Sequence, residues 1–305
     1  MRKKILVVGD IMVDRYTYVR TERTCPDAPV PVWDELRTEI RLGGAANVAN
    51  NLVSLIDGQD VDVYLAGIVG NDMKWKIEET GIKTLFCNVG PSIVKHRYVD
   101  VDGTRIIGRF DNFKQFSDEA TALFCDTLVA EWRHEKFDAV ILSDYRMGTI
   151  AARLAEDICR YHECPVYVDS KRKNLSMFSG ASLVKLNESE FVDQLSCRDY
   201  ECVESLFDVC VVTRGPKGAE LRTYEQEENR VMTGVIEAKY TIRSIEFPLV
   251  QKIDAVDVTG CGDTFMAALV YYVTTKSDDV AMAIKFANFC ATQVVQKFGT
   301  SVVRV

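Results

Sequence analysis

Short apolar runs alternate along the chain with longer segments of helical length. The apolar runs are bounded by polar turns and have the length of buried strands. Strands alternating with helices predict an α/β fold with a mostly parallel sheet flanked by helices on both faces. The predicted strands are 5–8, 63–68, 139–142, 166–168, 183–186 and 209–213, and the predicted helices are 45–56, 118–133, 150–161, 263–273 and 278–297. The last helix is apolar nearly all round and is expected to be buried.

Two regions, 13–41 and 93–110, depart from this alternation. The first mixes short extended pieces with prolines, and the second alternates around Asp102-Gly103, a strong hairpin signal. A small β element projecting from an α/β core suits a lid over a site at the carboxyl ends of the strands. Because no Pro-, Ser- or Gly-rich linker divides the 305 residues, residues 1–305 are expected to form one domain.

Composition narrows the class of protein. The net charge is −8 with scattered basic residues, which argues against nucleic acid as a partner. Apolar runs are too short for a membrane helix, so no membrane partner is expected. The ten cysteines include no C-x-x-C pair and the three histidines are isolated, which disfavours a zinc site. A reduced, cytoplasmic compartment fits this cysteine pattern.

The segment Gly260-Cys261-Gly262-Asp263 carries the clearest chemical signal. Its two glycines free the backbone to turn N–H groups inward where a helix begins, which favours binding of an anion. The partial positive charge of a helix N-terminus would stabilise a developing phosphoryl charge, and Asp263 could deprotonate a hydroxyl nucleophile. The alternative is an ordinary helix cap, since glycine and aspartate are common before helices.

Three other segments place glycine or polar residues at predicted strand and helix ends. Gly43 and Gly44 precede a helix that carries Asn47, and the alternative for them is a tight loop. Asn187 and Glu190 follow a strand and offer oxygen ligands to a hard cation such as Mg²⁺, or form a solvated helix start. Residues 211–219 form a strand, a turn and a return strand, which alone is only a hairpin.

The order of these motifs resembles that of the ribokinase (PfkB) superfamily of carbohydrate kinases. Asp257 to Asp263 is similar to its D-x-T-G-A-G-D motif, with Cys261 in place of alanine. The resemblance implies a ribokinase-like fold, ATP and Mg²⁺, with a monovalent cation as a further candidate. It makes Asp263 the base, and residues 260–262 the anion hole. The implied sugar contacts are Gly43, Gly44, Asn47 and Asp14, and the implied ATP-site residues are Thr213, Gly215, Gly218 and Asn288.

The resemblance also assigns the metal. Asn187 and Glu190 match the N-x-x-E motif that organises Mg²⁺ and phosphates, here through water. For Asn288, alone among apolar neighbours in the last predicted helix, a hydrogen bond to neighbouring backbone is the alternative.

Further stretches resemble the subfamily that phosphorylates the anomeric hydroxyl of D-glycero-D-manno-heptose 7-phosphate to give the 1,7-bisphosphate. They include residues 9–16, 26–32 and 297–301, with Asp144 in Ser-Asp-Tyr and Lys171 after Val-Asp-Ser. Such a substrate carries a phosphate dianion that cations must neutralise. Among the basic residues of the hairpin and loops, Arg97, Arg109 and Lys171 are the preferred candidates, with a solvated charged surface as the alternative.

Departures from the subfamily leave the acceptor open. Ser170-Lys171-Arg172 stands where the subfamily has P-K-G, and Lys185-Leu186-Asn187 where it has T-P-N. The alternatives are a kinase for another sugar or phosphosugar and a non-catalytic sensor of sugar or nucleotide. No H-x-G-H motif of a nucleotidyltransferase occurs, so a later step towards ADP-heptose is expected to need another protein. Unpaired lid edges and the resemblance predict a homodimer.

Overall fold

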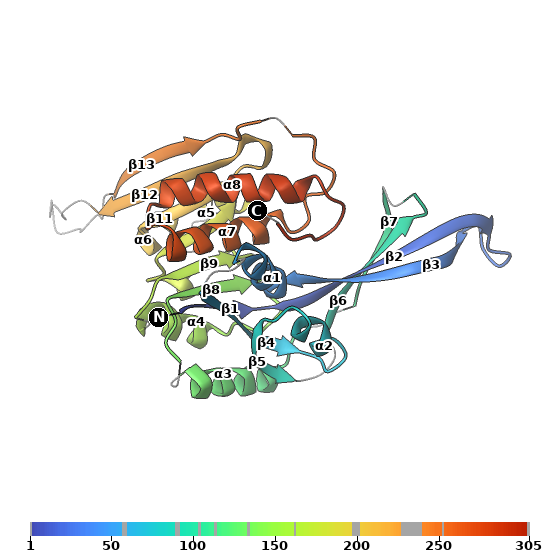
Figure 1. Ribbon diagram of the computed structural model, residues 1–305, viewed down its shortest axis with the longest axis horizontal. Helices are drawn as coiled ribbons and strands as arrows, with labels where there is room; N and C mark the ends of the chain where they lie inside the picture. The colour runs from blue at the N-terminus through green and yellow to red at the C-terminus, as the bar shows by residue number, and fades with distance from the viewer. Residues whose placement is uncertain are drawn as a thin grey trace.

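The computed structural model describes residues 2–56, 60–88, 92–102, 105–112, 115–132, 135–161, 163–196, 202–226, 240–251 and 253–303. Over these ranges the chain forms a large sheet covered by helices and a smaller sheet that projects from it, as Figure 1 shows. The prediction of an α/β fold with a small β element is therefore confirmed. Gly103 of the predicted hairpin turn lies outside the described residues.

The large sheet has nine strands in the order β13-β12-β11-β10-β9-β8-β1-β4-β5. Every neighbouring pair from β11 to β5 is parallel, whereas β12 and β13 add an antiparallel margin. Parallel strands need crossover segments between them, which is why helices separate them in sequence. The strands are β1 Lys3–Gly9, β4 Val61–Val69, β5 Lys83–Asn88, β8 Ala139–Asp144, β9 Val166–Ser170, β10 Leu183–Asn187, β11 Val209–Thr213, β12 Ala219–Gln226 and β13 Tyr240–Phe247.

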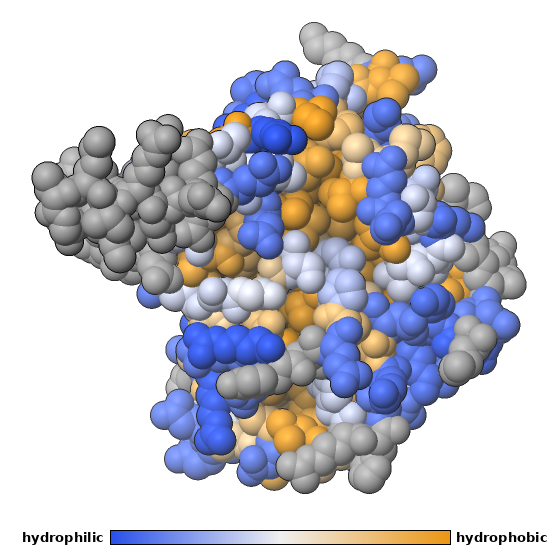
Figure 2. Space-filling view, turned by 90° about the vertical axis from the view of Figure 1, so that its left-hand side faces the viewer, coloured by the Kyte–Doolittle hydropathy of each residue, from blue (hydrophilic) through white to orange (hydrophobic). Residues whose placement is uncertain are grey.

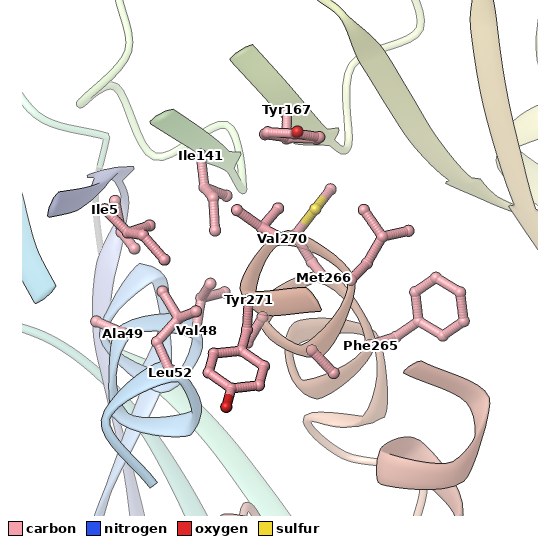
Figure 3. Close-up of a cluster of buried hydrophobic side chains, with 14 of the residues drawn as sticks. Ile5, Val48, Ala49, Leu52, Ile141, Tyr167, Phe265, Met266, Val270 and Tyr271 are labelled. Carbon is pink, nitrogen blue, oxygen red and sulfur yellow. The ribbon is translucent and has the colours of Figure 1, made fainter. Parts of the chain in front are cut away.

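Helices cover both faces of this sheet. On one face α1 (Ala45–Leu55), α7 (Cys261–Thr275) and α8 (Val280–Val295) pack against strand side chains such as Ile5 and Ile141, as Figure 3 shows. The opposite face is covered by α3 (Asp118–Trp132), α4 (Ala152–Tyr161), α5 (Glu188–Ser196) and α6 (Val203–Leu206), while α2 (Lys74–Glu78) is a short helix after β4. Single 3₁₀ turns occur at Ser176–Phe178 and Gly215–Lys217.

The predicted helices occur with shifted ends. The helix expected to start at residue 263 begins at Cys261, so Asp263 lies inside the first turn of α7. The last predicted helix forms as α8, but only part of its circumference is buried, because Met282 and Phe289 are exposed. No helix among the described residues is long and apolar enough to cross a membrane.

The smaller sheet has the order β3-β2-β6-β7 and forms the element predicted as a lid. Its strands are β2 Ile11–Thr24, β3 Pro31–Gly44, β6 Ile93–Asp100 and β7 Ile106–Asn112. The expected short pieces in 13–41 are instead two long antiparallel strands, because pairing across the bulges near Tyr18 and Arg20 sustains the extended backbone. Figure 2 views the molecule from the end opposite to this sheet, where hydrophilic residues surround a band of apolar ones.

Candidate active site

The Gly260 turn opens α7 beside the carboxyl ends of the parallel strands. Gly260 has φ +83°, a left-handed conformation that glycine adopts without strain. A Cβ there would lie 2.8 Å from Nδ2 of Asn47, so the turn and α1 are in close contact. Asp257 braces the turn by accepting hydrogen bonds from the amides of Thr259 and Gly299, both at 2.9 Å. The Cys261 amide donates to the carbonyl of Val258 at 3.2 Å, and the amides that follow it in the first turn can receive an anion.

Asp263 points from the first turn of α7 into the interior and is 4% exposed. Its Oδ2 accepts a hydrogen bond from Nδ2 of Asn47 at 2.8 Å, and its Oδ1 accepts one from the Tyr145 hydroxyl at 2.6 Å. Burial raises the pKa of Asp263 above its ordinary value, while these two hydrogen bonds oppose the rise. A carboxylate held by two donors with a raised pKa has the properties of a general base.

A chain of ion pairs between buried and partly buried side chains lies next to the predicted anion hole. The Nζ of Lys185, on β10, lies 3.3 Å from the position of a Cβ on Gly262 and pairs with Asp169 Oδ2 at 2.7 Å. Lys171 bridges Asp169 Oδ1 at 3.3 Å and Glu190 Oε1 at 2.8 Å. Burial alone would raise the pKa of Asp169, but the two ammonium groups outweigh it and hold the pKa below its usual value. This chain connects the anion hole to the predicted magnesium motif.

Asn187 and Glu190 form a reciprocal capping arrangement at the start of α5. Asn187 Oδ1 accepts from the Glu190 amide, and Glu190 Oε2 accepts from the Asn187 amide, both at 2.8 Å. Among the described residues no cluster of three or more His, Cys, Asp or Glu side chains could hold a metal directly. The two residues nevertheless supply oxygen donors, and Glu190 is only partly buried, which fits an ion held through water.

A cavity of about 180 Å³ lies beside the Gly260 turn, between the β11–β12 hairpin and helices α7 and α8. Thr213, Gly215, Gly218 and Asn288, all predicted ATP-site residues, line it together with Cys261 and Gly262 of the anion hole. The remaining lining is largely apolar and includes Leu249, Ile253, Val258, Phe265 and Val295. The four residues are therefore brought together in one cavity that is also lined by Cys261 and Gly262 of the Gly260 turn.

Asn288 makes the backbone hydrogen bond offered as its alternative role, and its predicted contact with ATP stays a prediction. Its Nδ2 donates to the carbonyl of Phe247 at 3.0 Å, which is the backbone hydrogen bond offered as the alternative. The same side chain borders the cavity.

Cys261 also lines this cavity. Burial raises the pKa of its thiol to about 11, so the residue stays a neutral, small side chain in the predicted anion hole.

The lid carries paired charges on the face turned towards the site. Arg97 on β6 forms a buried ion pair with Asp14 on β2, and Arg109 on β7 holds Asp111 through two hydrogen bonds of 2.8 and 2.7 Å. Arg97 and Arg109 are opposite each other in the strand register. Lys95, on the same strand as Arg97, lies over the Tyr145 ring, and its pKa is lowered by burial and by both arginines. Predicted sugar and phosphate contacts thus gather on one surface.

The glycine pair at the end of β3 allows close approach of backbone and acid side chains. Gly44 has φ +57° and begins α1, and a Cβ on it would collide with the carbonyl oxygen of Asp10. A Cβ on Gly43 would lie 2.9 Å from Asp14 Oδ2. Gly43, Gly44, Asn47 and Asp14 therefore meet as predicted, although their contacts with a sugar remain a prediction.

Asp144 is fully buried at the end of β8, and its carboxylate is engaged within the protein. Oδ2 accepts from Ser170 Oγ at 2.8 Å and from Arg172 Nε at 2.6 Å, and Oδ1 accepts from the amide of Arg146 at 3.0 Å. Its predicted contact with substrate stays a prediction. The two residues that depart from the subfamily's P-K-G, Ser170 and Arg172, are the ones that bind this carboxylate.

A strap formed by residues 298–303 connects the lid to the Gly260 turn through hydrogen bonds. The amide of Thr300 donates to the Tyr16 hydroxyl on β2 at 3.1 Å, and Arg41 on β3 donates to the carbonyls of Phe298 and Thr300. The Gly299 amide binds Asp257, and the Val303 amide binds Asn51 Oδ1 on α1 at 3.2 Å. The strap thereby braces both walls of the site.

Tyr145 and Asp169 are not among the predicted site residues, and Lys185 was expected only as a general cation. Tyr145 follows a predicted strand within Ser-Asp-Tyr, so its position at a strand end was a usable signal. Asp169 ends the next strand in the same way, and Lys185 is a charged residue inside an otherwise apolar run. A lysine in a buried strand requires a partner, which points to a neighbouring carboxylate.

Comparison with known proteins places these features in context. The family model described as pfkB family carbohydrate kinase matches residues 2–304. Two curated relatives, from Helicobacter pylori (strain J99) and Shewanella sediminis, are each named bifunctional protein HldE, with identities of 31% and 36% over 98% and 99% of this chain. The chain spans 64% and 62% of the length of these two relatives.

Solved structures share the fold at low sequence identity. Phosphofructokinase-2 from Escherichia coli, in complex with potassium, matches with a TM-score of 0.71 and 13% identity, over 99% of this chain and 96% of that one. Arabidopsis thaliana ribokinase, complexed with ribose and ATP, matches with a TM-score of 0.65 and 18% identity, over 100% and 97% of the two chains. At these identities the likeness supports the fold alone.

Proposed function

Since the chain belongs to the pfkB family of carbohydrate kinases, we propose that it transfers the γ-phosphate of ATP to the anomeric hydroxyl of D-glycero-D-manno-heptose 7-phosphate. The product would be the 1,7-bisphosphate. The observation that carries the proposal is the convergence of a buried base, a helix N-terminus and a cavity lined by the predicted nucleotide residues around Gly260–Asp263. The kinship with proteins named HldE supports the heptose phosphate as acceptor.

Asp263 is the proposed general base. It would accept the proton of the anomeric hydroxyl while that oxygen forms a bond to the γ-phosphorus. The bond between this phosphorus and the bridging oxygen of ADP breaks, and ADP leaves with the electron pair. Asn47 would hold the carboxylate from the sugar side, as its 2.8 Å hydrogen bond to Oδ2 supports.

The anion hole and Lys185 would stabilise the charge on the transferred group. The amides of the first turn of α7 carry the partial positive charge of the helix end. Lys185 would add a positive charge next to Gly262, and its side chain is buried. A magnesium ion held through water by Asn187 and Glu190 would neutralise charge on the ATP phosphates.

The charged lid face is the proposed site for the 7-phosphate of the acceptor. Arg97, Arg109 and Lys171 supply the cations, and Lys95 joins them because it lies between Arg97, Arg109 and the Tyr145 ring. A phosphate dianion there would be bound by charge-assisted hydrogen bonds, with the arginines able to bind in a bidentate manner. Asp14 would then face the sugar hydroxyls next to Gly43.

An acceptor panel tests the substrate. ADP formation is measured with ATP and Mg²⁺ and with D-glycero-D-manno-heptose 7-phosphate, fructose 6-phosphate, fructose or ribose as acceptor. The expected result is the highest kcat/KM with the heptose 7-phosphate and little turnover without a sugar. Turnover of ribose or fructose alone would overturn the assignment, and acceptor binding without any ADP formation would favour the sensor.

We also propose a homodimer formed through the lid. Its strands expose large apolar side chains, which single soluble chains usually bury. They are Val30, Trp33, Leu36, Ile106 and Phe110, with Val101 in the following turn. Light scattering at micromolar concentration is expected to give twice the mass of the chain, and the variant Trp33→Ser with Phe110→Ser should shift it to the monomer. A wild-type monomer would contradict the proposal.

A further inference from the structure

Each oxygen of the Asp263 carboxylate accepts a hydrogen bond, and the two donors belong to different parts of the chain. Asn47 on α1 donates to Oδ2, and Tyr145, just after β8, donates to Oδ1 at 2.6 Å. A carboxylate offers about four lone pairs, so one lone pair on each oxygen remains for other partners. The plane of the carboxylate, and hence the direction of the free lone pairs, is fixed only when both donors are present.

The backbone that delivers Tyr145 is held by Asp10. The fully buried carboxylate of Asp10 accepts hydrogen bonds from the amides of Tyr145 at 2.7 Å, Met147 at 3.0 Å and Thr149 at 3.1 Å. Arg146 is held at φ 65°, a conformation that a non-glycine residue adopts only where its surroundings enforce it. The backbone that carries Tyr145 is therefore held by these bonds, and its hydroxyl is held by the hydrogen bond to Asp263.

Two ammonium groups from different elements lie near the ring of Tyr145. Lys95 Nζ, on the lid, is 5.2 Å from the ring centroid, and Lys171 Nζ, after β9, is 5.7 Å from it. Charged groups that face the hydroxyl also include Asp263 on α7, Asp169 on β9 and Asp14 on β2. Burial and then these carboxylates raise the pKa of Tyr145 well above 10, so the hydroxyl remains a hydrogen-bond donor at neutral pH.

We propose that Tyr145 is a positioning residue for phosphoryl transfer: its hydroxyl orients the Asp263 carboxylate so that a free lone pair faces the acceptor hydroxyl. The inference rests on the proposed role of Asp263 as the base. Because Lys95 and Lys171 are also the proposed partners of the acceptor phosphate, Tyr145 connects phosphate binding at one end of the sugar to base alignment at the other. No covalent step involves Tyr145.

The variant Tyr145→Phe tests this role because it removes one hydrogen-bond donor and keeps the ring. Using ATP and D-glycero-D-manno-heptose 7-phosphate, kcat is expected to fall roughly ten-fold or more while the KM for ATP stays within about two-fold. The donor stabilises the ionised carboxylate, so its loss raises the pKa of Asp263. The acidic limb of the kcat/KM profile should therefore move to higher pH by about one unit.

A second replacement keeps the test decisive if Tyr145→Phe folds poorly. Incorporation of 3,5-difluorotyrosine at position 145 makes the phenol a stronger donor, and the acidic limb should move in the opposite direction, to lower pH. Tyr167→Phe, at a buried tyrosine on β9, is the matched control and should leave the profile unchanged. If Tyr145 had only a structural role, its replacement would lower the unfolding temperature of the protein. The acidic limb of the kcat/KM profile would then not move in opposite directions for the two replacements.

The outcome for Tyr145 is separable from that for Asp263. If Asp263→Asn retains full turnover, the base assignment fails and the role of Tyr145 fails with it. If Asp263→Asn is inactive while Tyr145→Phe keeps wild-type kcat and an unshifted profile, only the positioning role is overturned.

Discussion

The site has two halves of opposite character that meet at Asp263. The nucleotide half, formed by the β11–β12 hairpin with α7 and α8, is lined mainly by apolar side chains, glycines and one amide. The acceptor half, formed by the lid face and the loops after β8 and β9, holds a dense set of ion pairs. The half proposed for the nucleotide is an open cavity. The half proposed for the acceptor is occupied by basic and acidic side chains that form ion pairs with one another.

The difference indicates how each half would bind its ligand. An apolar cavity with few polar groups binds by shape and excludes water without rearrangement. In the acceptor half, Arg97 and Arg109 already form ion pairs with Asp14 and Asp111. A bound phosphate would have to replace these aspartates as the partner of the arginines. Binding there is therefore an exchange of partners, and it should depend on ionic strength more strongly than nucleotide binding does.

The largest effect is expected where the two halves meet. Asp263→Asn removes the base but leaves the cavity intact, so kcat should fall by roughly three orders of magnitude while ATP binding stays nearly unchanged. Phosphoryl transfer is measured by ADP formation, and ATP binding by calorimetry. A variant with more than a tenth of wild-type turnover would contradict the assignment.

A smaller effect is expected for the cation beneath the anion hole. Lys185→Met removes the ammonium group next to Gly262 and should lower kcat about 100-fold, the usual cost of losing one donor to a developing negative charge. Asp169 would keep Lys171 as a partner. Adding Asp169→Asn should restore stability but not the rate, and Lys83→Met, in an exposed pair with Asp62, is the control.

Arg97→Gln should affect the acceptor half alone. It removes a phosphate partner and leaves Asp14 buried without its partner, so the KM for the heptose phosphate should rise about ten-fold. The free energy of unfolding should fall by about 3–5 kcal/mol, measured by urea denaturation. The double variant Asp14→Asn with Arg97→Gln should recover stability. An equal rise in the KM for ATP would show that the halves are not separate.

The mildest effect is expected in the nucleotide half. Gly218 has φ +91°, and a Cβ on it would collide with the carbonyl oxygen of Phe247. Gly218→Ala should therefore cost roughly 1–3 kcal/mol of stability and raise the KM for ATP several-fold. The KM for the acceptor should not change. Gly81→Ala, also at positive φ but with open space around it, is the control for backbone strain alone.

The sequence predicted best what is encoded locally. The Gly260–Asp263 turn, the glycine pair before α1 and the Asn187–Glu190 pair are short segments whose residue types determine their geometry. Asn187 and Glu190 form a capping arrangement in place of the solvated helix start offered as the alternative. For Asn288, in α8, the alternative of a hydrogen bond to backbone is confirmed. In these segments the structural and the proposed functional roles coexist.

Contacts between distant segments could not be predicted in the same way. The Tyr145 hydrogen bond to Asp263 joins residues 118 positions apart, and the Lys185–Asp169 pair depends on the lateral order of β9 and β10. Arg97 was recognised as a cation, but its pairing with Asp14 depends on the register of β6 against β2. Arg109 differs, because its partner Asp111 lies two positions along the same strand. Periodicity assigns elements, whereas side-chain partners require their arrangement in space.

The strap formed by residues 298–303 has a consequence for the order of assembly on the ribosome. Every strand, both sheets and α7 are synthesised before it, so a nascent chain can complete its sheets while the Gly260 turn lacks its brace through Gly299. The hydrogen bonds of Tyr16 and Arg41, where the lid meets the large sheet, to Thr300 and Phe298 also form only after residues 298–303 have been synthesised. The turn that carries the proposed base would therefore gain this brace after the strands of both sheets have been synthesised.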